Sequence, residues 1–231
     1  MLYMMSDALT SLYSSSFYES ILNFDAGILL WIQDFLRNSV LNVIMLFITH
    51  SSDAGLIWLF LTLGLCIHPK TRKLGLCAVL AMIFSLIVCN GILKNVFQRV
   101  RPYAEVDGIK VIPGLSLLPG VEEAWDYSFP SGHTSYSFST SVAIFAASEK
   151  KHKIITVWLV VFAALVGFSR LYVGIHYPTD VIAAALIATG MACLAAFLGT
   201  KLYDFLVIKF PWIKGKPKKV KEEAEQEVKK E

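Results

Sequence analysis

Apolar stretches separated by short polar segments make up most of this chain. Stretches without Asp, Glu, Lys or Arg run from Asn38 to Ser52, Ala54 to Pro69, Leu74 to Leu93, Thr134 to Ser148, Ile154 to Ser169 and Val181 to Thr200. A helix needs about 20 apolar residues to span the hydrocarbon of a bilayer, and each stretch can extend into flanking interfacial residues. The pattern therefore predicts an all-α fold, a polytopic membrane bundle of about six transmembrane helices.

An earlier apolar segment, Phe24 to Leu36, contains Asp25 and Asp34 and is followed by Arg37. It is either an interfacial helix that leads into a short span or the first half of one long tilted span. Around these helices we expect an N-terminal segment over residues 1–20, a membrane domain over 21–212 and a charged tail over 213–231. Residues 1–20 lack the pattern of a removable signal peptide.

Basic residues indicate the orientation in the membrane. They gather in two short loops and in the C-terminal tail, the loop residues being Lys70, Arg72, Lys73, Lys150, Lys151 and Lys153. With six spans these three regions share one side, which the positive-inside rule places in the cytoplasm together with both termini. The other side receives residues 50–53, 99–131 and 169–180, so a site formed there would lie at the outer membrane–water boundary.

Composition supports a membrane protein and removes other classes. Hydrophobic residues make up 55% of the 231 residues and charged residues 17%, against about 25% in soluble domains. The tail from Lys214 to Glu231 holds 12 of the 39 charged side chains (7 Lys, 5 Glu) and 2 of the net +3 charges. Nucleic acid is therefore not expected as a partner. The tail is most simply solvated, and binding to anionic lipid headgroups is the weaker alternative.

Lys94 and Arg101 form the first candidate motif, at the end of the third apolar stretch. Their spacing of seven residues predicts that both lie on one helix face, about 10.5 Å apart along the axis. Pro102 would then stop the helix. Taken alone, the pair is typical of interfacial cations that snorkel to lipid headgroups.

The second motif, Pro130-Ser131-Gly132-His133, opens the fourth apolar stretch. Ser131 suits an N-cap, and Gly132 allows a ligand to approach the backbone, so the helix N-terminus offers N–H groups to an anion. His133 would project from the same first turn. An ordinary serine cap with an interfacial histidine is the alternative interpretation.

The third motif joins Ser169-Arg170, at the end of the fifth stretch, to His176 and Asp180 at the start of the sixth. Spacing of four predicts that Asp180 and His176 share a helix face, where the carboxylate would keep one ring nitrogen protonated and leave the other as a nucleophile. A structural His–Asp pair is the alternative. Arg170 argues for a site because it adds a third ionisable group at the same boundary.

Together the three motifs supply three cations, a helix N-terminus and two histidines on one side of the membrane. Phosphoryl transfer needs donors for the phosphoryl oxygens, an in-line nucleophile and an acid for the leaving oxygen. No carboxylate cluster suggests a metal, so the cations would neutralise the charge that Mg²⁺ otherwise handles. We therefore expect phosphoryl transfer without a metal or another cofactor.

In this order and spacing the motifs resemble the three-part signature of the type 2 phosphatidic acid phosphatase family. The resemblance spans residues 94–180, and every signature position is matched. It implies that His176 attacks phosphorus to form a phosphohistidine, that Asp180 orients its imidazole, and that His133 protonates the leaving group. It also implies phosphate binding by Lys94, Arg101, Ser131, Gly132 and Arg170, whereas Ser169 would fix the turn or add a donor.

The predicted function is that of an integral membrane phosphatase acting on lipid phosphates or diphosphates, such as undecaprenyl diphosphate, phosphatidylglycerophosphate or phosphatidate. Two alternatives stay open: a lipid phosphotransferase that uses the same site, and a membrane protein that binds anions or lipids without chemistry. Substrate lipid and membrane lipids are the expected partners. The sequence does not determine the oligomeric state.

Residues 102–129 form one long extramembrane connection, and a connection of this length is typical of a functional lid. Trp125 and Tyr127 lie just before the second motif. The acids of the connection are expected on a solvated face: Glu105, Asp107, Glu122, Glu123 and Asp126. His68 and His152 are expected at the interface of the basic loops, whereas His50 and Asp53 have at most a peripheral role in the site.

Overall fold

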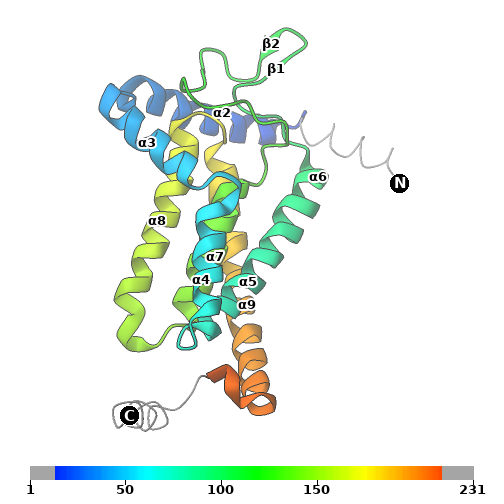
Figure 1. Ribbon diagram of the computed structural model, residues 1–231. Coiled ribbons are helices and arrows are strands. Elements are labelled where there is room, and N and C mark those ends of the chain that lie inside the picture. Colours follow the sequence, from blue (N-terminus) through cyan, green and yellow to red (C-terminus); the bar gives the residue numbers. More distant parts are fainter. Residues whose placement is uncertain (1–13, 215–231) are drawn as a thin grey trace, which may run out of the picture.

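The computed structural model describes residues 14–214, and helices dominate this range (Figure 1). The N-terminal half contains α2 (Ser16–Trp31) with its π-helical continuation η1 (Ile32–Leu36), α3 (Ser39–Ser51), η2 (Asp53–Gly55), α4 (Leu56–Ile67), α5 (Arg72–Ser85), the π-helical η3 (Leu86–Leu93) and α6 (Lys94–Phe97). The C-terminal half contains β1 (Glu105–Val106), β2 (Ile109–Lys110), α7 (Gly132–Ala147), η4 (Lys150–His152), α8 (Lys153–Tyr172), α9 (Pro178–Lys209) and η5 (Pro211–Lys214).

Three continuous helices are long and apolar enough to cross a membrane on their own, namely Arg72–Phe97, Lys150–Tyr172 and Pro178–Lys209. The pair α3 and α4 would count as a fourth span, but the two helices meet at a bend of 51°. α7 has 16 residues and packs against α5, α8 and α9 inside the bundle. The membrane bundle is thus confirmed, whereas the expected number of six spans is not.

The first apolar segment forms α2 and η1, which lie across one end of the bundle rather than along its axis (Figure 1). This arrangement fits the interfacial interpretation of residues 24–36. The reason is visible at Asp25, which is fully buried and pairs with Arg99 at 2.7 Å. α2 starts at Ser16, inside the expected N-terminal segment, and residues 1–13 and 215–231 lie outside the described range.

Small residues let the central helices approach closely. Ala81 of α5, Ala143 of α7, and Ala192 and Ala195 of α9 form one buried cluster. At Gly199 of α9 an added Cβ would lie 2.8 Å from the sulfur of Cys77. Because lipid tails are as apolar as leucine, close packing of small residues is what holds helices together in a membrane.

The connection between α6 and α7 is anchored to the end of the bundle by apolar side chains. Ile112 and Leu115 pack with Leu29 of α2 and with Tyr177, and the backbone N–H of Leu118 donates to the carbonyl of Val173 at 3.0 Å. The hairpin of β1 and β2 turns at residues 107 and 108, which both have positive φ as a two-residue hairpin turn requires. The connection therefore covers this end as a fixed layer.

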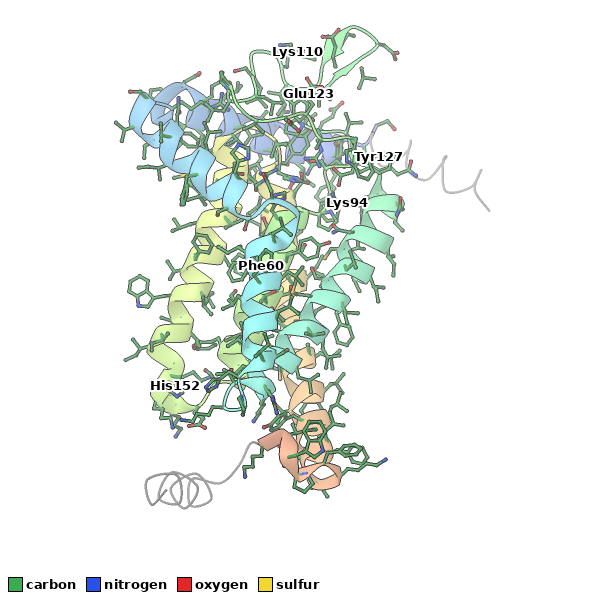
Figure 2. The ribbon with its side chains drawn as sticks, viewed as in Figure 1. Phe60, Lys94, Lys110, Glu123, Tyr127 and His152 are labelled. Atoms are coloured by element: carbon green, nitrogen blue, oxygen red, sulfur yellow. The ribbon has the colours of Figure 1, made fainter. Side chains whose placement is uncertain are left out.

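Different segments lie at the two ends of the bundle. Lys94 and the long connection lie at one end, and His152 in the basic loop lies at the other (Figure 2). α2 lies at the Lys94 end, whereas η5 lies at the opposite end (Figure 1). The described range therefore begins and ends at opposite ends of the bundle, and the side of the membrane on which the termini lie stays a prediction, because residues 1–13 and 215–231 lie outside this range.

Candidate active site

A cavity of about 320 Å³ opens where α6, α7 and α8 meet the long connection. The motif residues that line this cavity are Lys94, Arg101, Gly132, His133, Arg170 and His176. Its remaining lining consists of Gly55, Asn90, Ala124, Asp126 and Tyr136. Six of the nine residues singled out in the sequence therefore face one space, although they come from distant parts of the chain.

Lys94 and Arg101 do not share a helix face as predicted. The helix ends at Phe97, because Gln98 adopts a left-handed conformation with φ 47°, and Arg101 lies in the following connection. The two cations meet nevertheless, since both form ion pairs with the carboxylate of Asp126. Arg101 also donates to the carbonyl of Ile175 at 3.0 Å, which ties it to the third motif.

Asp126 pairs with two of the cations that the sequence analysis assigned to phosphate binding. It was expected on a solvated face, but one carboxylate oxygen contacts Lys94 and the other contacts Arg101. Burial raises its pKa, but the hydrogen bonds and charges of the two cations lower it by more, so the pKa lies below the usual value. The cavity therefore contains an ionised carboxylate that is shared by two of its cations.

His176 and Asp180 interact, although not as neighbours on one helix face. His176 precedes α9, and Tyr177 is the N-cap residue of that helix. Asp180, in the first turn, accepts the backbone N–H of Tyr177 at 3.1 Å and lies 3.4 Å from Nδ1 of His176. Ser128, which the sequence analysis missed, donates to Asp180 and lies 3.4 Å from the same nitrogen.

These contacts assign the tautomer of His176. Nη1 of Arg101 lies 3.3 Å from Nε2 of His176, and arginine can only donate, so Nε2 carries the lone pair. Nδ1 then carries the proton and faces Asp180. Burial lowers the pKa of His176 well below its usual value, and the charges of Arg101 and Arg170 lower it further. The imidazole is therefore neutral at pH 7, and its Nε2 lone pair, which accepts from Arg101, lies on the cavity side.

His133 contacts a pair of residues to which the sequence analysis gave at most a peripheral role. Its Nε2 lies 3.1 Å from Asp53, whose other carboxylate oxygen lies 2.9 Å from Nδ1 of His50. Nε2 of His50 lies 3.1 Å from the carbonyl of Gly120, so this chain of contacts reaches the long connection. Asp53 is in position to orient His133 at the rim of the cavity.

Arg170 is the least satisfied cation of the site. Its guanidinium is buried and donates to the hydroxyl of Thr49, but its Nε has no hydrogen-bond partner among the described residues. Within residues 14–214 it also forms no ion pair, unlike Lys94 and Arg101. Arg170 therefore has donors available for an anion in the cavity.

Two serines of the motifs serve the fold rather than the cavity. Ser169 donates to the carbonyl of Val166 at 2.7 Å, inside its own helix. Ser131 is the N-cap residue of α7, but its hydroxyl makes no cap hydrogen bond and instead accepts from Thr134 at 3.0 Å. Neither lines the cavity, and their part in phosphate binding stays a prediction.

Gly132 allows α7 to approach η3 closely. A Cβ at this position would lie 3.1 Å from Oδ1 of Asn90, and Asn90 donates to the hydroxyl of Tyr136. The glycine is therefore required by a neighbouring side chain, in addition to any ligand. Across residues 14–214 no group of three or more His, Cys, Asp or Glu side chains is placed to hold a metal ion.

Comparison with known proteins agrees with this geometry. The family model of the PAP2 superfamily matches residues 74–203, which is more than half of the chain and includes all three motifs. The chain belongs to the PAP2 superfamily. The predicted family is thereby confirmed, and with it the enzyme class, a membrane phosphatase that acts on lipid phosphates.

Two curated relatives and one solved structure illustrate the similarity. An undecaprenyl-diphosphatase of Sulfolobus acidocaldarius is 31% identical over 68% of this chain and 70% of that protein. An undecaprenyl-diphosphatase of Bacillus subtilis is 34% identical over 74% of this chain and 79% of that protein. The crystal structure of a transmembrane PAP2-type phosphatidylglycerolphosphate phosphatase from Bacillus subtilis aligns with a TM-score of 0.63 at 27% identity, covering 87% of this chain and 94% of that chain.

The position of Asp126 gives a first prediction for this PAP2 protein. Asp126→Asn removes the carboxylate that competes with an anion for Lys94 and Arg101, so vanadate should inhibit the variant at about tenfold lower concentration. Inhibition of phosphate release by vanadate measures the effect. Glu123→Gln is the matched control, because Glu123 belongs to the same connection but not to this cavity. Unchanged or weaker inhibition in Asp126→Asn would show that the anion binds elsewhere.

Proposed function

We propose that this protein hydrolyses a polyprenyl diphosphate of the undecaprenyl type at the outer face of the membrane. Three observations support the substrate class. Both curated relatives described above are undecaprenyl-diphosphatases, the bundle is a membrane fold, and the cavity lies at its end, where a lipid can enter sideways and present its phosphates. We propose a broader lipid phosphate range as the secondary activity.

The outward orientation of the site is part of the proposal. Basic loop residues gather at the end of the bundle marked by His152, and the cavity lies at the end marked by Lys94 (Figure 2). The positive-inside rule favours a cytoplasmic location for the basic end. A carrier lipid that is released as a diphosphate on the outer side would then reach the site directly.

The first chemical step follows from the geometry of the cavity. The lone pair on Nε2 of His176 attacks phosphorus, the bond from phosphorus to the leaving oxygen breaks, and His133 donates a proton to that oxygen. The developing positive charge on the imidazole is offset by Asp180 beside Nδ1. Lys94, Arg101 and Arg170 bind the phosphoryl oxygens once Asp126 has moved away, so no metal ion is needed to offset their charge.

The second step releases phosphate. Water attacks the phosphohistidine, the bond between phosphorus and Nε2 breaks, and the water proton passes to His133, which restores the acid for the next turnover. Gly132 at the start of α7 contributes backbone to the cavity wall, where the helix N-terminus favours an anion. Ser131 and Ser169 keep α7 and α8 in place and make no phosphate contact in this scheme.

One observation carries the proposal: a neutral histidine with its lone pair toward a cavity lies beside a second histidine and three cations. The test is phosphate release by detergent-purified protein in EDTA from undecaprenyl diphosphate, phosphatidylglycerophosphate and phosphatidate. We expect release from undecaprenyl diphosphate to be fastest, with kcat/KM at least about tenfold above the other two lipids. His176→Ala supplies the blank for each substrate.

Each outcome of this panel has a distinct meaning. Release from phosphatidate but not from the polyprenyl diphosphate would overturn the substrate class and leave the enzyme class intact. No release from any lipid, with vanadate still bound, would instead favour transfer to a lipid or sugar hydroxyl, which an added acceptor and labelled phosphate would detect. Release that EDTA abolishes would overturn the metal-independent mechanism.

A further inference from the structure

A second arginine of the α6–α7 connection, Arg99, lies behind the site. It is buried, and its Nη1 donates to Oδ1 of Asp180 and to the hydroxyl of Thr179, both at 2.7 Å. Its Nη2 donates to Asp25 at 2.7 Å, and its guanidinium stacks 3.7 Å above the ring of Tyr177. Arg99 therefore binds Asp180, whereas Arg101 contacts His176, the residue that Asp180 faces.

The two oxygens of the Asp180 carboxylate have different partners. Oδ1 accepts from Arg99, whereas Oδ2 accepts from Ser128 and from the backbone N–H of Tyr177 and faces Nδ1 of His176. Arg99 donates to Asp180 from Nη1 alone, because its Nη2 donates to Asp25, and a charge-assisted hydrogen bond of this kind restrains the carboxylate oxygen that accepts it. Without Arg99 the fully buried Oδ1 would lose its partner, and the carboxylate would rotate away from the imidazole to find another.

Asp25 supplies the charge that balances Arg99. Besides Arg99 it accepts the backbone N–H of Thr179 at 3.0 Å and the hydroxyl of Thr179 at 2.6 Å, at the N-terminus of α9, where a carboxylate is favoured. Burial lowers the pKa of Arg99, but the carboxylates of Asp180 and Asp25 raise it by more. Arg99 is therefore charged and lies between the side chains of Asp25 and Asp180.

We propose that Arg99 and Asp25 are positioning residues for the pair of His176 and Asp180. Arg99 holds the Asp180 carboxylate toward the imidazole, and Asp25 offsets the charge of Arg99, so that Asp180 keeps its negative charge for the phosphohistidine that forms. The inference rests on the proposed function, because it takes His176 as the nucleophile. On this proposal the interfacial helix α2, which lies far from the motifs in sequence, contributes a residue that positions the site.

Two near-isosteric variants test the proposal, Arg99→Gln and Asp25→Asn. Both disturb the orientation or the charge of Asp180, so kcat should fall about tenfold to hundredfold in each. KM and vanadate inhibition should change by less than about threefold, because the cations that line the cavity are untouched. Phosphate release from an activated aryl phosphate gives all three values for the purified full chain.

The pH profile separates a positioning role from a general loss of packing. Asp25→Asn leaves the positive charge of Arg99 unbalanced, which lowers the pKa of His176. More of the imidazole then stays neutral in acid, so the ratio of kcat/KM at about pH 5 to kcat/KM at about pH 7 should rise. Arg99→Gln removes a positive charge, which raises that pKa and lowers the same ratio. The double variant restores the net charge and should return the ratio to the wild-type value, whereas disturbed packing would shift both single variants in one direction.

The other ionisable groups around His176 are the same in all these variants. They come from every element that packs against it, namely Lys94 of α6, Arg101 and Asp126 of the connection, His133 of α7, Arg170 of α8 and Asp180 of α9. Opposite shifts in the two single variants would therefore arise from Arg99 and Asp25 themselves.

Arg37→Gln is the matched control. Arg37 is also a partly buried arginine at this end of the bundle, and it donates to the carbonyls of Tyr172 and Ser116 at 3.1 and 2.9 Å, but it has no contact with Asp180. Its replacement should lower thermal stability and leave the pH ratio unchanged. If Arg99→Gln does not fold, Arg99→Lys keeps the charge and loses the fork, so it should lower kcat and keep the wild-type pH ratio.

Failure of this inference differs from failure of the proposed function. Arg99 and Asp25 variants that behave like Arg37→Gln, or that raise KM with kcat unchanged, would overturn the positioning role while His176→Ala stays inactive. A His176→Ala variant as active as the wild-type protein would overturn the proposed function itself.

Discussion

Replacing His176 with alanine is expected to abolish the phosphoenzyme and to lower turnover by about 10⁴-fold or more, as losses of other covalent nucleophiles do. The reason is geometric, since the lone pair of Nε2 is placed in the cavity by Arg101 on one side and by Asp180 on the other. Acid quenching of protein mixed with ³²P-labelled substrate, followed by electrophoresis at alkaline pH, measures the phosphohistidine directly.

His133→Ala is the informative comparison for that experiment. The proposed acid is needed most when the leaving oxygen is basic, so this variant should lose about 10²- to 10⁴-fold with a lipid phosphate and far less with an aryl phosphate. Labelled phosphoenzyme should still form from the aryl substrate. Equal and complete loss for both variants on both substrates would contradict the assigned roles of nucleophile and acid.

Arg170→Ala should also have a large effect, with kcat/KM lowered about 10²- to 10³-fold and vanadate inhibition weakened in parallel. Its buried Nε lacks a partner within the described residues, so its donors can bind the transferring phosphoryl group without first giving up an ion pair. Lys94 and Arg101 must first release Asp126. Alanine at either of those positions should therefore cost less than at Arg170.

Two further variants test whether the effect of Arg170 depends on its charge and its fork. Arg170→Lys keeps the charge but cannot donate from two nitrogens in one plane, so it should recover only part of the loss. Arg37→Ala removes an arginine at the same end that lies outside the cavity lining and should leave vanadate inhibition unchanged. Vanadate inhibition unaffected in Arg170→Ala would mean that the anion site lies elsewhere.

Much of the fold was predictable from where apolar stretches begin and end. Four of the six stretches form helices whose ends are shifted by a few residues, and Ala54 to Pro69 starts with the short η2 before α4. The sixth stretch ends at Thr200, but α9 continues to Lys209. The number of spans was not predictable. Whether α3 continues into α4 or bends against it depends on what packs beside the break. The position of α2 across the end of the bundle, where Asp25 pairs with Arg99, was not predictable either.

For the site too, some residues were predictable from the sequence and others were not. Side-chain types and spacing identified the histidines and the cavity-lining cations, because phosphoryl transfer restricts which groups can serve. The residues that sequence analysis missed act through partners that are distant in the chain, as Asp126 does with Lys94 and Ser128 does with Asp180. Arg99 was noticeable in the sequence as a third cation between Lys94 and Arg101, but the spacing of residues did not indicate which side chains it would bind.

The sequence by itself determined a membrane bundle, a PAP2 signature and a metal-free set of groups for phosphoryl transfer, because composition and motif chemistry are local properties. Only the tertiary structure decided that the helix ends at Phe97, that Asp126 pairs with Lys94 beside the cavity, and that Arg99 pairs with Asp180. Ion pairs between distant segments depend on how helices of similar apolarity pack. A linear pattern does not contain that information.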